Sequence, residues 1–153
     1  MEIRAFDSDL LVPLRQLYLE TRLATFVWLD CSGFTLTDFD RDTEGERIWV
    51  AMDSARVVGF LSVWEPANFI HHLYVCTDSL RTGIGTKLLD ACKSTHAELS
   101  LKCLAQNQQA ISFYKSSGFV IHSAEGSGLE RYYLMQYSRD TRYNYVVDRL
   151  DGY

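Results

Sequence analysis

The sequence lacks the features that mark a metal-dependent, disulfide-linked or membrane protein. Its four cysteines, Cys31, Cys76, Cys92 and Cys103, include no CxxC pair, so we interpret them as buried apolar side chains rather than metal or redox ligands. No stretch reaches the roughly 18 consecutive apolar residues of a membrane span, and the N-terminus, MEIRAFDSDL, has no signal-peptide core. With two prolines in 153 residues and no internal repeat or linker, we expect one soluble, cytoplasmic domain over residues 1–139, followed by an extension at 140–153.

An excess of positive charge is missing as well. Fifteen basic and twenty acidic residues give a net charge of −5, which argues against nucleic acid as the main partner and mildly favours a cationic ligand. Five carboxylates gather around one arginine in DFDRDTEGE, residues 38–46. This stretch is either a solvated surface or an acidic rim beside a site.

Metal-ligand spacing is absent among the histidines. His71 and His72 are adjacent, and neighbouring residues of a strand point to opposite faces. We therefore expect that they do not share one ion, that His72 is structural, and that the chain holds no metal.

Hydrophobic periodicity predicts a mixed fold with one sheet. Strand-like runs alternate with helical patterns, and a strand–helix–strand crossover lies in the middle of the chain. Strands are expected at Ile3–Phe6, Arg47–Asp53, Arg56–Trp64, Phe69–Cys76, Leu99–Ala105, 119–124 and 129–139, and helices at 10–18, from Gly83 to near Ala97, and from Asn107 to Gly118; the acidic stretch adds a short helix. The class is α+β (α/β), and Phe69–Cys76 is expected to be a central strand covered on both faces.

The glycine pair in SLRTGIGTKLL, residues 79–89, lies where a predicted strand meets a predicted helix. Helix N-termini present unpaired backbone N–H groups, and glycines let a phosphate approach them. A dinucleotide fingerprint would need a third glycine where Leu88 stands, and a P-loop sequence is missing. The loop is therefore either a phosphate cradle of another kind or a structural turn.

A second motif, NQQAISFYKSSGF at residues 107–119, follows about twenty residues later. Asn107 and Tyr114 are seven residues apart, so on a helix they share one face, about 10 Å apart along the axis. Together with the LYV…GIG unit, this motif resembles the GCN5-related N-acetyltransferase (GNAT) superfamily over roughly residues 3–138. The resemblance implies a mixed, mostly antiparallel sheet of six to seven strands flanked by helices.

The resemblance also implies a set of acetyl-CoA-binding residues. The pyrophosphate loop corresponds to Arg81, Thr82, Gly83, Ile84, Gly85 and Thr86, the strand that faces the pantetheine arm to Leu73, Tyr74 and Val75, and the second motif to Asn107, Ala110 and Tyr114. One position departs from the family pattern: the side chain three residues before the first glycine is Leu80 instead of glutamine or arginine, and an arginine follows one residue later. Whether Arg81 compensates stays open.

The implied reaction is direct attack of a neutral amine on the acetyl thioester. Tyr114 is then the acid for the departing thiolate, and a backbone N–H of residues 73–75 serves the oxyanion. Many relatives have a glutamate early on the preceding strand, where this chain has Phe69. His71 lies on the same strand face and is a candidate base, a substrate-shaping residue or a packed histidine; Glu65 is a second candidate base.

The expected partner is a primary amine on a small molecule or peptide, with a cationic acceptor favoured and with the protein a monomer or homodimer. A non-catalytic acyl-CoA-binding or regulatory domain is the alternative, because the strand glutamate and the side chain at Leu80 depart from the family pattern. A plain interaction domain with a structural GxG turn is the third interpretation.

Overall fold

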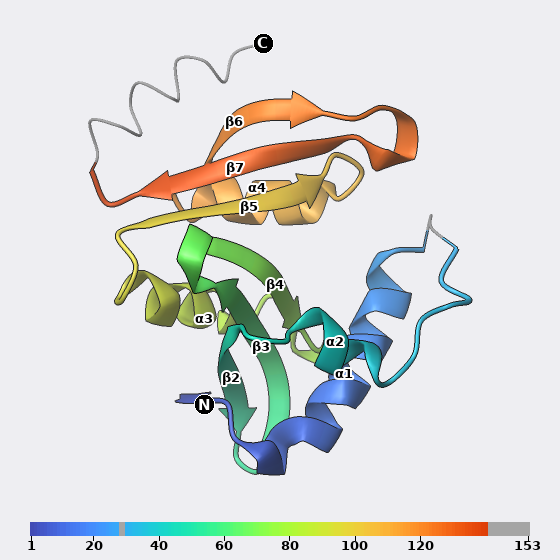
Figure 1. Cartoon of the computed structure of the whole chain (residues 1–153). Helices are drawn as coiled ribbons and strands as arrows, with labels where there is room; N and C mark the ends of the chain where they lie inside the picture. The colour runs from blue at the N-terminus through green and yellow to red at the C-terminus, as the bar shows by residue number, and fades with distance from the viewer. Residues whose placement is uncertain (28–29, 141–153) are drawn as a thin grey trace. The chain divides into compact units, whose positions relative to one another are not determined.

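The computed structural model describes residues 1–27 and 30–140. The expected extension beyond Asp140 lies outside the described residues. The elements, in chain order, are β1 (Glu2–Ala5), α1 (Leu11–Thr25), α2 (Asp38–Asp42), β2 (Arg47–Asp53), β3 (Arg56–Trp64), β4 (Phe69–Val75), α3 (Ile84–Lys93), β5 (Glu98–Leu104), α4 (Gln108–Ser116), β6 (Val120–Glu125) and β7 (Tyr132–Ser138) (Figure 1).

The strands form one seven-stranded sheet in the order β1-β2-β3-β4-β5-β7-β6. The β4–β5 pair is parallel, whereas β1–β2, β2–β3, β5–β7 and β6–β7 are antiparallel. This confirms the predicted mixed sheet and the central strand–helix–strand crossover. The described residues form two compact units, the first made of residues 1–65 and 71–92 and the second of residues 66–70 and 93–140.

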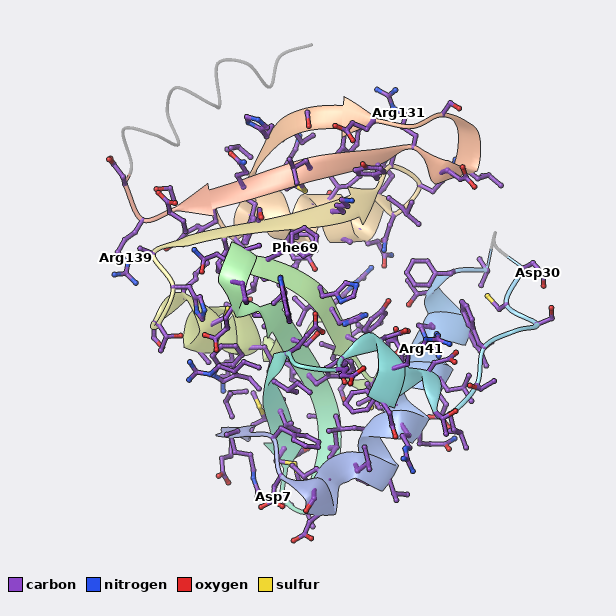
Figure 2. The ribbon with its side chains drawn as sticks, viewed as in Figure 1. Asp7, Asp30, Arg41, Phe69, Arg131 and Arg139 are labelled. Atoms are coloured by element: carbon purple, nitrogen blue, oxygen red, sulfur yellow. The ribbon has the colours of Figure 1, made fainter. Side chains whose placement is uncertain are left out.

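The first unit is built around the β2–β3 hairpin. Asp7 lies between β1 and α1 (Figure 2), where its carboxylate accepts a hydrogen bond from the backbone N–H of Asp9 and starts the helical turn. The apolar face of α1 places Leu14, Leu17 and Tyr18 in the core. Burial of the apolar face of α1 against the β2–β3 hairpin stabilises both elements. The two hairpin strands have the predicted bounds.

Gly59 permits α3 and β4 to pack closely against β3. A Cβ at this position would lie 3.0 Å from the carbonyl oxygen of Tyr74, 3.2 Å from Cγ2 of Ile84 and 3.3 Å from Cδ1 of Leu88. We expect Gly59→Ala to lower the free energy of unfolding by about 1–3 kcal/mol, because the backbone oxygen cannot move aside without shifting the strand. Urea titration of the full chain measures the loss. Gly33→Ala is the matched control, since its Cβ would meet nothing within 4 Å; equal losses in the two variants would contradict the packing argument.

The second unit is held by the antiparallel β5–β7–β6 ladders and α4. Asn107 caps α4 as predicted, because its Oδ1 accepts a hydrogen bond of 3.2 Å from the backbone N–H of Ala110. Gly118, with φ of 92°, ends the helix in the left-handed region. The ring of Phe119 then stacks beside Tyr137 of β7, with centroids 5.6 Å apart.

Several predictions about elements are wrong in detail. The helix expected at 10–18 continues to Thr25, and the strand expected at 129–139 begins at Tyr132, after a 3-10 turn at Gly128–Glu130. The helix that starts after Gly83 ends at Lys93 rather than near Ala97, because a turn at residues 94–95 leads the chain into β5. The carbonyl of Ala97, immediately before β5, accepts a hydrogen bond from the backbone N–H of Arg139. Strand β4 is not covered on both faces, because His71 is exposed. Among the described helices, none has the length and apolar character that a membrane span requires.

Candidate active site

The glycine loop joins β4 to α3 in the first unit. Leu80 is extended and half exposed, and Arg81 and Gly83 both take left-handed backbone angles, with φ of 63° and 85°. The backbone N–H of Lys87 donates to the carbonyl of Gly83 over 3.1 Å, which is the first hydrogen bond of the α3 ladder. The N–H groups of residues 84–86 precede that ladder, so they are the groups a phosphate would meet.

The side chains of the loop contribute less than the sequence suggested. The hydroxyl of Thr82 donates to the carbonyl of Ser79 over 2.6 Å, so its proton is engaged within the loop. Beside the loop lies an open depression of about 450 Å³, lined among others by Thr82, Arg56 and Lys87. Two cations therefore border the loop, although Arg56 is also paired with Asp78 at 2.8 Å.

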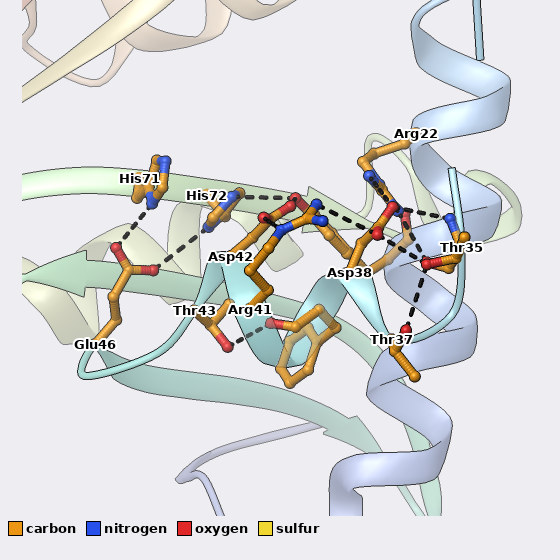
Figure 3. Close-up of polar contacts among 12 residues, drawn as sticks. Arg22, Thr35, Thr37, Asp38, Arg41, Asp42, Thr43, Glu46, His71 and His72 are labelled. Atoms are coloured by element: carbon orange, nitrogen blue, oxygen red, sulfur yellow. Dashed lines mark hydrogen bonds and ion pairs between the residues drawn. The ribbon is translucent and has the colours of Figure 1, made fainter. Parts of the chain in front are cut away.

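Glu46 joins His71 and His72 into one cluster at the start of β4 (Figure 3). Nδ1 of His71 lies 2.8 Å from Oε2 of Glu46, and Nδ1 of His72 lies 3.5 Å from Oε1. The two imidazole centroids are only 4.0 Å apart. Opposite strand faces do not keep the donor atoms of the adjacent histidines apart, because one donor atom from each of the three side chains lies within 4.8 Å of the others.

A buried chain of hydrogen bonds extends from this cluster. Tyr18 Oη donates to Oδ2 of Asp42 over 2.7 Å and lies 3.2 Å from Nε2 of His72. Because the single phenol proton goes to the carboxylate, Nε2 of His72 must be the donor to Tyr18. Nδ1 of His72 then carries a lone pair and accepts the hydroxyl proton of Ser62 over 2.8 Å.

Burial largely determines the protonation of the side chains in this hydrogen-bonded series. Desolvation lowers the pKa of His72, against the raising effect of Glu46, so the imidazole is neutral at pH 7. Burial alone would raise the pKa of Glu46, but the two neighbouring imidazoles outweigh it and the pKa is lowered. Desolvation, followed by the hydrogen bond to Asp42, raises the pKa of Tyr18. His72 is therefore structural, as predicted, and is also the link between Glu46 and Tyr18.

The acidic stretch is largely neutralised within the first unit. Asp38 pairs with Arg22 and Arg41, and Asp40 pairs with Arg15. The backbone N–H of Thr35 donates to Asp38 and is the main reason that the pKa of this carboxyl lies below its ordinary value. Asp42 and Glu46 belong to the buried chain described above, so four of the five carboxylates have partners and the stretch is not an unpaired acidic rim.

Glu65, the second candidate base, lies at the end of β3. Its carboxylate is 3.7 Å from Nη1 of Arg47, and both side chains are about half exposed. The carboxylate that lies 2.8 Å from Nδ1 of His71 is that of Glu46.

The second motif lies on α4 in the second unit. The ring of Tyr114 packs between Phe113 and Phe119, with centroids 5.3 and 5.6 Å away. The backbone N–H groups of Ser117 and Phe119 both donate to the carbonyl of Tyr114, which fixes this turn of the chain. Asn107 uses Oδ1 for the helix cap, and its side-chain N–H₂ remains the group able to meet a ligand.

Glu46 is the site residue that sequence reasoning missed. It is 25 residues from His71, and no local spacing connects the two positions. It was read only as one charge of the acidic stretch. The sequence offered one signal: Glu46 immediately precedes β2, and β2 belongs to the same sheet as β4, which carries the histidines.

Comparison with known proteins identifies related chains. The family model described as "Acetyltransferase (GNAT) domain" matches residues 44–121. The peptidyl-lysine N-acetyltransferase YiaC of Escherichia coli strain K12 is 30% identical over 94 residues, which cover 61% of this chain and 62% of that protein, less than two thirds of its length.

Two solved structures share the fold. The PaiA N-acetyltransferase from Thermoplasma acidophilum, solved in complex with coenzyme A, is 20% identical, with a TM-score of 0.75 over 90% of this chain and 98% of that one. The yncA structure from Salmonella typhimurium, solved with its cofactor acetyl-CoA, is also 20% identical, with a TM-score of 0.70 over 92% of this chain and 94% of that one.

Proposed function

The chain belongs to the GNAT acetyltransferase domain family, and from that premise we propose that it transfers the acetyl group of acetyl-CoA to a primary amine. The observation that carries the proposal is the strand–loop–helix junction at Gly83, where a left-handed glycine opens α3 and leaves its first N–H groups outside the helical ladder. Such a terminus suits the pyrophosphate of acetyl-CoA. The coenzyme A and acetyl-CoA bound by the two structural neighbours are consistent with this ligand.

Residues of both units have proposed roles toward acetyl-CoA. In the first unit the backbone of residues 83–86 holds the pyrophosphate, with Arg81 and Thr82 beside it, and the backbone of 73–75 faces the pantetheine arm. In the second unit Asn107 donates through its side-chain N–H₂, next to Ala110. These assignments follow the family motifs residue by residue.

Acetyl transfer needs a proton acceptor and a proton donor. We assign His71 as the group that takes the proton of the attacking amine and Tyr114 as the group that protonates the departing sulfur. Glu46 accepts the hydrogen bond of His71 Nδ1, which fixes the ring and leaves Nε2 as the nitrogen that takes a proton. A backbone N–H of residues 73–75 stabilises the negative charge on the carbonyl oxygen.

The acceptor is proposed to be a primary amine of a peptide or a small molecule. The relative YiaC is named for peptidyl-lysine, which makes a lysine side chain the first acceptor to test. Because most carboxylates of the acidic stretch are paired, the stretch gives little support for a cationic acceptor. A non-catalytic acyl-CoA-binding domain is the alternative, because the side chain of Leu80 offers the pyrophosphate no hydrogen-bond donor.

An amine panel tests the proposal directly. Release of free thiol from acetyl-CoA is measured with lysine peptides, peptide N-termini, polyamines, aminoglycosides and amino acids, together with acetyl-CoA binding by calorimetry. Turnover with at least one amine is the expected result. Stoichiometric binding without thiol release across the whole panel would favour the non-catalytic alternative, and absence of binding would contradict both.

His71→Ala is expected to lower kcat/KM for the amine about tenfold. This is less than the usual 10²–10⁴ for a general base, because the side chain is half exposed and water can reach the amine. Steady-state kinetics at saturating acetyl-CoA measure the change. His122→Ala, which removes an exposed histidine of β6, is the control; unchanged kinetics in His71→Ala would reject the assignment.

A further inference from the structure

We propose that Glu46, His71 and His72 form a binding site for a divalent transition-metal ion of the Zn²⁺ type. Each side chain offers one donor atom, and the three atoms lie within 4.8 Å of one another. All three belong to the first unit, with Glu46 before β2 and the histidines on β4. The inference is argued from these three side chains alone, and with the ion bound His71 no longer serves as the base proposed above.

The donor set and its spacing suit such an ion. Two imidazoles and a carboxylate are ligands that Zn²⁺ takes at about 2.0–2.2 Å, which puts neighbouring ligand atoms of a tetrahedral site about 3.3 Å apart. The contact of His71 Nδ1 with Oε2 of Glu46 is 2.8 Å and that of His72 Nδ1 with Oε1 is 3.5 Å, so they lie on either side of that value. The three donor atoms lie within 4.8 Å of one another, so the site must contract as it takes up the ion.

The carboxylate carries an independent sign of a missing cation. Oε1 of Glu46 is buried, and among the described residues it has no hydrogen-bond partner, although the side chain is only 4% exposed. It faces Nδ1 of His72, which carries a lone pair because Nε2 holds the proton. A buried carboxylate oxygen without a hydrogen-bond donor costs free energy, and a bound cation relieves that cost.

The surroundings of His72 already match those of a metal-binding histidine. Its Nε2–H donates to Tyr18, and Tyr18 donates to Asp42. A metal-bound histidine usually donates its other ring N–H in this way, which fixes the tautomer and the ring orientation. Ser62, whose hydroxyl proton now goes to Nδ1 of His72, must turn that proton away when the ion binds.

His71 provides access to the site. Its side chain is 49% exposed, whereas those of His72 and Glu46 are buried, so an ion enters from the His71 side and keeps water in its remaining position. The proton that His71 Nδ1 now donates to Glu46 moves to Nε2 when Nδ1 takes the metal, so the ring stays neutral.

Calorimetric titration of the full chain with ZnCl₂ in a non-chelating buffer tests the site. One ion per chain is expected, with Kd raised at least tenfold in His71→Ala and in Glu46→Gln. His71→Ala is the decisive variant, because its half-exposed side chain can be removed without disturbing the core, and circular dichroism checks its fold. Absence of binding by the wild-type chain, or equal binding by wild type and His71→Ala, would overturn the proposal.

Two controls separate this site from other ligands of the chain. His122→Ala removes a single exposed imidazole, and Cys31→Ser/Cys76→Ser removes two partly exposed thiols. Both variants are expected to bind one ion with the wild-type Kd. A loss of binding in either one, with His71→Ala unaffected, would assign the ion to that histidine or thiol instead.

Discussion

Tyr114→Phe is expected to lower kcat about 10²-fold while the Kd for acetyl-CoA stays within about twofold of wild type. The phenylalanine keeps the ring between Phe113 and Phe119, so the packing of α4 is retained. Only the hydroxyl is lost, and with it the proposed proton donor to the departing sulfur. Steady-state kinetics give kcat, and calorimetry gives the Kd for acetyl-CoA.

The size of the effect follows from the chemistry of the leaving group. An ordinary phenol has a pKa of about 10 and a thiol of about 8.5, so complete proton transfer to the thiolate is uphill. The hydroxyl therefore acts while charge develops on sulfur, which affects kcat and not the affinity for acetyl-CoA. Tyr132→Phe is the matched control, because that hydroxyl donates to the exposed Glu125. If Tyr114→Phe and Tyr132→Phe turn over alike, Tyr114 is not the donor.

The sequence predicted most of the fold because its signals are local. The bounds of the hairpin strands at Arg47–Asp53 and Arg56–Trp64 were predicted to the residue, since alternation and a short polar turn delimit them. The end of α3 was missed because it depends on a distant partner. The carbonyl of Ala97, immediately before β5, accepts a hydrogen bond from the backbone N–H of Arg139, which is 42 residues further along the chain.

The candidate site could be predicted only where it is made of motifs. The glycine loop and the Asn107 cap lie within contiguous stretches, so spacing was enough to find them. The Glu46–His71–His72 cluster combines a loop and a strand that are 25 residues apart. The face rule for strands separated His71 from His72, but it did not include the carboxylate that brings their donor atoms together.

Arg22→Met is expected to lower the free energy of unfolding by about 3 kcal/mol. Both side chains of the Arg22–Asp38 pair are less than one-tenth exposed, and Nη1 and Nη2 of the arginine each lie 3.3 Å from Oδ2 of Asp38. Methionine keeps much of the apolar contact with the rings of Tyr18 and Phe34, over which the guanidinium lies at 3.8 and 4.2 Å. What it removes is the charge that compensates a buried carboxylate.

The loss is expected at the lower end of the 3–5 kcal/mol found for a broken buried pair. Asp38 keeps hydrogen bonds of 2.8 Å from both the backbone N–H and the hydroxyl of Thr35, and it keeps the ion pair with Arg41. Urea titration measures the change. Arg15→Met, which breaks the exposed pair with Asp40, is the control and is expected to leave the midpoint nearly unchanged.

A second variant separates the charge effect from lost packing. In Arg22→Met/Asp38→Asn no buried charge is left unpaired, so much of the lost stability is expected to return. The pH dependence gives the same test. The pKa of Asp38 is lowered on folding, chiefly by Thr35 and further by Arg22, so its contribution is present above the unfolded value of 3.8 and is lost as the pH falls through the lower folded value. Arg22→Met removes part of that depression, so its stability should fall less steeply below pH 4 than that of the wild type; parallel curves would mean that the lost stability comes from packing alone.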